Sequence, residues 1–143
     1  MRTWLVRGVV LAVVHAAVAV GVAAVRAGDP TGTGTVEALA LAALVAVAAV
    51  WAAVDGWLDV PDRGRAWVIA ALVAGWGSAV LSVIGRAVFV DQTGVRALGQ
   101  ALTGGAAFTA LLVLVPAALG LVVGPRLAGD RRDEDEETPA PSP

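Results

Sequence analysis

The sequence predicts an all-α membrane protein, a four-helix transmembrane bundle with both its N- and C-termini in the cytoplasm. Three observations lead to this fold class. The 143-residue chain is 58% apolar and only 15% charged, whereas soluble domains are about 25% charged. Its charges gather in short clusters between four long apolar runs, and a bilayer core about 30 Å thick needs about 20 such residues. The segments between the runs are too short to fold independently.

Each span is delimited by charged or aromatic residues at its ends. Trp4, Trp57 and Trp67 lie at run ends, where tryptophan prefers the membrane interface. Pro116 removes one backbone hydrogen bond within the fourth run and is a candidate hinge. The four predicted spans run from about residue 5 to 26, 37 to 57, 66 to 88 and 97 to 124 (5–26, 37–57, 66–88 and 97–124).

Two domains follow from this division. Residues 1–129 form the four-helix transmembrane domain, and residues 130–143 form an acidic, proline-rich tail that we expect to be disordered because it can bury little apolar surface. A cleaved signal peptide is an alternative for the first span, since Arg2 and Arg7 precede it. Its apolar stretch, however, exceeds the roughly 7–15 residues usual for such signals.

The orientation follows from the arginines, which are concentrated on the cytoplasmic side of membrane proteins. One side of the predicted bundle holds seven arginines and the other holds three. The larger group predicts that both termini of this multi-pass membrane protein lie in the cytoplasm. The three arginines on the outer side are Arg26, Arg86 and Arg96.

Composition and motifs exclude several classes of function. The chain has no cysteine and one histidine, so we expect neither disulfides nor a metal site, and no cofactor. No hydrolase, metalloprotease or nucleotide-binding motif is present, so we do not expect an enzyme. The first 129 residues carry a net charge of +2 and the tail carries −4, which is not the profile of a nucleic-acid-binding protein.

Polar residues inside the spans are the strongest functional indication, because they are costly in lipid and face the bundle interior. Ser78, Ser82 and Arg86 share one face of the third span by their spacing, and Gln100 and Thr103 form a second polar face. The two faces are expected to meet near the outer side of the membrane. The candidate solute pathway consists of Ser78, Ser82, Arg86, Asp91, Gln100 and Thr103.

Two interpretations of these residues stay open. In the first, they line an outward vestibule for a polar or charged solute, with Arg86 and Asp91 at its mouth. In the second, Asp91 or Thr93 caps the fourth helix, Arg86 extends to the lipid headgroups, and the remaining polar groups hold helices together.

His15 is the one ionisable residue deep within the apolar runs, and acidic residues occur only at or beyond the ends of these runs. An imidazole can gain or lose a proton near neutral pH, so His15 is a candidate proton-responsive group. The alternative is a neutral histidine that is hydrogen-bonded across the bundle. Asp55, at the inner end of the second span, is expected to lie at the membrane interface.

Several segments resemble a known family. They are "WLVRGVVLAVVHA" at the start, "DPTGT" in the first loop, "DG" after the second span and "FVDQTGV…LGQALTGGAAFTALLVLVPA". Together they resemble the actinobacterial four-transmembrane-helix drug/metabolite transporter-like proteins. The resemblance implies an inner-membrane protein that functions in transport.

The leading hypothesis is therefore a transporter-like protein that moves a small solute across the inner membrane. One four-helix unit makes a thin wall around a pathway, so we expect a homo-oligomer, such as a homodimer, in contact with the lipid bilayer. The alternative is a non-transporting structural or regulatory membrane protein that assembles with a partner complex.

Overall fold

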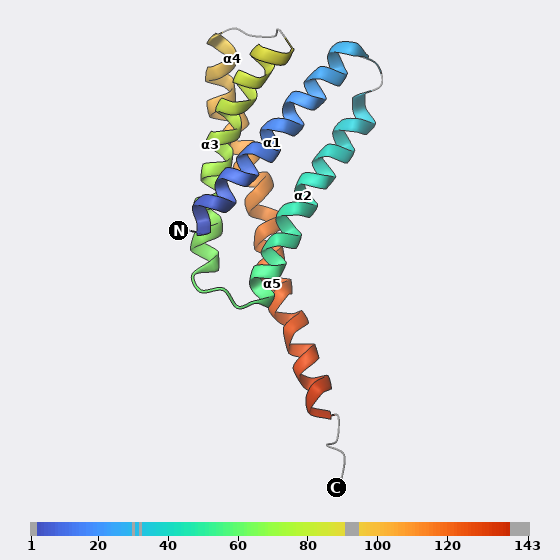
Figure 1. Ribbon diagram of the computed structural model, residues 1–143, viewed down its shortest axis with the longest axis vertical. Helices are drawn as coiled ribbons and strands as arrows, with labels where there is room; N and C mark the ends of the chain where they lie inside the picture. The colour runs from blue at the N-terminus through green and yellow to red at the C-terminus, as the bar shows by residue number, and fades with distance from the viewer. Residues whose placement is uncertain (1–2, 30, 32, 91–94, 138–143) are drawn as a thin grey trace.

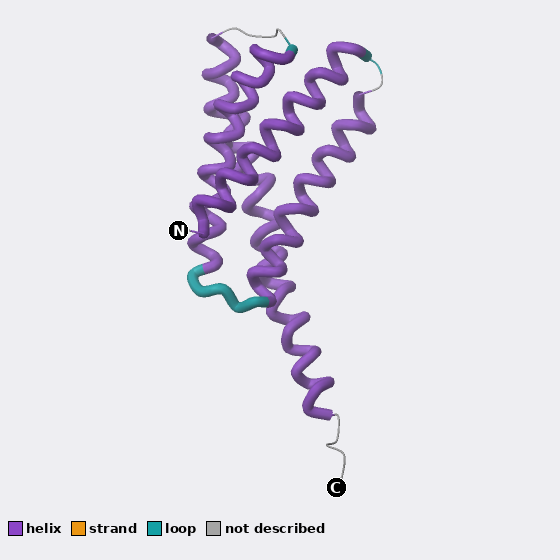
Figure 2. Tube along the Cα trace, in the orientation of Figure 1, coloured by secondary structure: helices purple, strands orange, loops and turns teal. Residues whose placement is uncertain are grey.

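The protein is an all-α bundle, seen in a computed structural model that describes residues 3–29, 31, 33–90 and 95–137 (Figure 1). Short connections join the helices (Figure 2). Four helical segments are long and apolar enough to cross a membrane, which agrees with the four predicted spans. The elements are α1 (Thr3–Gly28), α2 (Thr33–Trp57), α3 (Arg63–Phe89), α4 (Val95–Gln100), the π-helical segment η1 (Ala101–Gly105) and α5 (Ala106–Glu137).

The bundle consists of two closely packed helix pairs. Helix α1 packs along α3, and α2 packs along α5, whereas α1 and α2 make few contacts with each other. Helices α3 and α5 join the two pairs. The segment from α4 to α5 therefore runs obliquely, beside α3 at one end and beside α2 at the other (Figure 1).

Small side chains allow this close packing. Five of the eight residues in the central core are alanines, whose small side chains let the helix backbones approach closely. The core lies between the middle of the bundle and the end at which α1 begins. It consists of Leu11, Ala48, Ala52, Trp67, Ala71, Ala74, Val113 and Ala117.

The outer surface suits contact with lipid. Large apolar side chains are exposed on every long helix, for example Val13, Leu39, Leu72 and Leu119. A soluble protein rarely exposes apolar surface so extensively. The four long apolar helices thus indicate a multi-pass membrane protein that contacts the bilayer.

Trp67, which the sequence predicted at the membrane interface, is 1% exposed and packs within the core, where its indole N–H donates to the buried Asp55. Helix α5 extends to Glu137, because glutamate and arginine favour helix and the segment continues an existing one. The division at residue 129 and the disorder of the tail stay predictions. Pro116 is buried within α5, which continues through it, and its role as a hinge stays a prediction.

Candidate functional site: a cavity shared by the four spans

A cavity of about 700 Å³ is lined by all four membrane spans. Binding pockets for small molecules range over roughly 300–1,000 Å³. The cavity lies toward the end of the bundle where α1 and α3 finish, which we call the mouth end. It reaches inward to His15, and the core separates it from the opposite, closed end.

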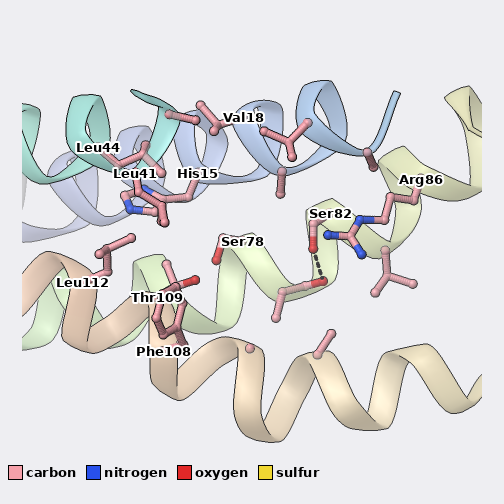
Figure 3. A pocket seen from close by; sticks show the side chains of 18 of the residues that line it. His15, Val18, Leu41, Leu44, Ser78, Ser82, Arg86, Phe108, Thr109 and Leu112 are labelled. Carbon is pink, nitrogen blue, oxygen red and sulfur yellow. Dashed lines mark hydrogen bonds between the residues drawn. The ribbon is translucent and has the colours of Figure 1, made fainter. Parts of the chain in front are cut away.

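The cavity gathers most of the predicted pathway residues. Ser78, Ser82 and Arg86 line it from α3, and Gln100 lines it from α4. His15 lies at its inner end, on α1, facing α3 and α5 (Figure 3). Thus side chains that the sequence assigned to separate groups, a polar pathway and a proton-responsive histidine, share one space.

The two serines do not tie helices together. The Ser78 hydroxyl donates to the Gly75 carbonyl at 3.1 Å, and the Ser82 hydroxyl donates to the Ala79 carbonyl at 3.0 Å. Both acceptors belong to α3 itself, so these bonds leave the lone pairs of the serine oxygens facing the cavity. The two serines therefore do not support the interpretation in which the polar residues serve only to hold helices together.

Thr103 departs from its predicted place. It is exposed, does not line the cavity, and donates to the Gly99 carbonyl of its own helical segment at 3.0 Å. The cause is η1, because a π-helical turn places residues i and i+5 in register, where an α-helix places i and i+4. Gln100 and Gly105 consequently share the cavity wall, and Thr103 is turned away.

At the mouth, charged residues from three helices come together. Arg26 of α1 forms an ion pair with Glu37 of α2, and both line the cavity. Arg86 is exposed and makes no ion pair with another residue of the described part of the chain. Asp91, predicted at this mouth, lies outside the described residues.

A buried polar cluster that the sequence reading missed lies at the closed end. Arg7 Nη2 donates to Asp55 Oδ1, and Trp67 Nε1 donates to Asp55 Oδ2, both at 2.8 Å. Arg7 and Asp55 are 7% and 4% exposed, so Asp55, which the sequence predicted at the membrane interface, is buried between helices. We call Arg7, Asp55 and Trp67 the Asp55 cluster.

The Asp55 cluster connects α2 to two helices, α1 and α3, that α2 otherwise contacts little. Asp55 belongs to α2, and its two donors belong to α1 and α3, so it links the α1–α3 pair to the α2–α5 pair. The Arg7 guanidinium also lies 5.9 Å from the centre of the Trp67 ring, within the range of a cation–π contact. Trp51 packs edge-on against the same ring.

Comparison with known proteins assigns no family. No protein-family model matches the chain, and no curated protein matches it. The resemblance to drug/metabolite transporter-like proteins therefore stays a prediction. Among the residues that the structure describes, no group of three or more His, Asp or Glu could hold a metal ion.

Proposed function

We propose that this protein is a transporter-like membrane protein that admits a small solute through the mouth of its cavity. The single observation that supports the proposal is the cavity itself, which all four spans line and in which Ser78, Ser82, Arg86 and Gln100 meet His15. Polar groups are expensive in a membrane interior unless they serve a pathway or find partners. In this proposal the mouth faces the outer side of a bacterial inner membrane, the orientation that the arginine distribution favours.

Transport requires more than this one conformation. A solute at His15 is separated from the closed end by the alanine-rich core and then by the Asp55 cluster. Passage would require the α1–α3 pair to move relative to the α2–α5 pair, which breaks the bonds to Asp55. The few contacts between α1 and α2 suit such a movement, and a second copy of the chain would complete the wall around the pathway.

Cysteine accessibility tests whether the cavity holds water, since the chain has no cysteine of its own. Single variants Ser78→Cys and Ser82→Cys are expected to react with a membrane-impermeant maleimide about tenfold faster than Leu81→Cys, because a thiolate forms only where water reaches. Leu81 is the matched control, since it neighbours Ser82 on α3 but lies on the exposed apolar face. Thr103→Cys is expected to react as slowly as Leu81→Cys.

The same experiment can reject the proposal. Thr35→Cys, at the exposed start of α2, reports that the reagent reaches the mouth end. If Thr35→Cys reacts while both serine variants stay unlabelled, the bundle is dry, and the alternative of a structural or regulatory membrane protein replaces transport. Labelling of Thr35→Cys from the outside of intact cells also tests the proposed orientation.

A further inference from the structure

The inner end of the cavity contains a hydrogen-bond acceptor without a partner. His15 Nδ1 lies 2.8 Å from the Leu11 carbonyl oxygen, and a carbonyl only accepts, so Nδ1 carries the proton. In the neutral ring Nε2 then has a lone pair and no proton. His15 is 5% exposed, and its Nε2 has no hydrogen-bond partner within the described part of the chain.

The neighbouring polar groups offer further acceptor capacity. Ser78 is buried on the facing helix α3, and because its proton goes to the Gly75 carbonyl, its oxygen can accept from a ligand. Thr109 contributes a second hydroxyl from α5, near His15 and Ser78 in the view of Figure 3. A ligand group that donates a hydrogen bond would match this end of the cavity.

The mouth end offers hydrogen-bond donors and positive charge, whereas the inner end offers acceptors. The Arg86 guanidinium presents several N–H donors in a plane, which suits a carboxylate or phosphate group. Arg26 is already paired with Glu37, so among the described residues that line the cavity Arg86 is the cationic side chain without an acidic partner. An anionic group is therefore expected at this end.

The walls between the two ends are largely apolar. Val18, Val22, Leu41, Val83 and Phe108 all line this region. Ser78 and Arg86 are eight residues apart on one helix, so their levels differ by roughly 12 Å at 1.5 Å per residue. A ligand that reaches both ends must have an elongated apolar body.

From these three zones we infer that the cavity binds an elongated amphiphilic organic anion whose far end carries a hydrogen-bond donor. The anionic group lies at Arg86, the apolar body follows the walls, and the donor reaches His15 Nε2. This inference rests on the proposed function, because it names the substrate class of the same cavity.

The experiment compares two probes that differ only in the terminal donor, ω-hydroxydecanoate and decanoate. Each is added to vesicles containing the Ser82→Cys protein, and the rate of maleimide labelling is measured. The hydroxylated probe is expected to slow labelling at about tenfold lower concentration, the ratio that one hydrogen bond of ordinary strength provides. Labelling of Thr35→Cys, outside the cavity lining, should not change with either probe.

Second-site variants in the Ser82→Cys protein test separately how each end of the ligand contributes to binding. His15→Asn can still donate to the Leu11 carbonyl but places no acceptor where Nε2 lies, so the two probes should become equal. His15→Gln, whose longer amide reaches that position, should restore part of the difference. Arg86→Gln should weaken both probes by a similar factor and leave their ratio unchanged.

The outcomes distinguish this inference from the proposed function. Absence of Ser82→Cys labelling without a probe contradicts the proposed function and this inference with it. Labelling that neither probe slows, or that both slow equally in the protein with His15, contradicts the inference alone. Persistence of the tenfold difference in His15→Asn also overturns it, since the donor would then bind elsewhere.

Discussion

Replacing Asp55 with alanine is expected to lower the free energy of unfolding by about 3–5 kcal/mol, the range for removing one partner of a buried ion pair. The variant removes both 2.8 Å hydrogen bonds that Asp55 accepts. It leaves the Arg7 guanidinium, whose Nη1 already has no partner among the described residues, as a buried charge without its carboxylate. The measurement is reversible unfolding of the purified protein in mixed detergent micelles, followed by loss of helicity.

A matched pair of carboxylate-to-amide variants serves as the control. Asp55→Asn removes the charge of the buried carboxylate, and Glu37→Gln removes that of the more exposed pair with Arg26. Exposed pairs contribute about 0.2–1 kcal/mol, so Glu37→Gln should have a small effect and Asp55→Asn a clearly larger one. Equal losses in the two variants would show that the Asp55 cluster does not hold the helix pairs together.

The double variant Arg7→Met/Asp55→Leu tests the physical cause. Replacing both charges with apolar side chains of similar size is often neutral for stability, because no buried charge is left unpaired. The double variant is therefore expected to regain most of the stability that Asp55→Ala loses. A loss as large as that of Asp55→Ala would instead assign the effect to the packing around Trp67.

The four spans could be predicted from the sequence because they depend on a local property. Length, apolar composition and the charges at the ends are visible along the chain, and each predicted span matches a long helix. The shared face of Ser78, Ser82 and Arg86 was equally predictable, since α3 keeps a regular helical period through these residues. In both cases, no knowledge of a distant contact is needed.

The Asp55 cluster depends on contacts between distant segments, since Arg7 and Asp55 are 48 residues apart. Both residues stand at the ends of apolar runs in the sequence, which therefore did not predict that they form a buried ion pair. A usable signal nevertheless existed, because the predicted spans 5–26 and 37–57 enclose one charge of each sign near the same end. Opposite charges at similar depth in neighbouring spans are expected to pair, since an isolated charge there is costly.

The face of Thr103 could not be predicted for a different reason. The 3.6-residue period assumes an unbroken α-helix, and η1 interrupts that period between Gln100 and Ala106. The glycines at 104 and 105 permit many backbone conformations but do not specify a π-helical turn. The cavity could not be predicted either. Its volume depends on the separation between α1 and α2, and the apolar sequences of these helices do not show which helices pack closely and which stay apart.

The glycine pair at 120 and 124 gives the second prediction of large effect. Such pairs can mediate contact between copies of a chain, but here both glycines pack against α2 of the same molecule. A Cβ at Gly120 would lie 2.3 Å from the Ala49 carbonyl oxygen, and one at Gly124 would lie 2.2 Å from the Ala53 carbonyl oxygen. These obstacles are backbone atoms, so no side-chain rotation can relieve the overlap.

Gly124→Ala is therefore expected to lower the free energy of unfolding by about 1–3 kcal/mol, as overpacking of a tight core does, and Gly124→Leu by more. The control is Gly21→Ala on α1, where a Cβ meets nothing within 4 Å and alanine should be neutral or stabilise by about 0.4–1 kcal/mol. Unfolding in micelles measures stability, and sedimentation measures association. If Gly124→Leu instead leaves stability unchanged and converts an oligomer into monomers, the pair joins copies of the chain, and its assignment to α2–α5 packing is wrong.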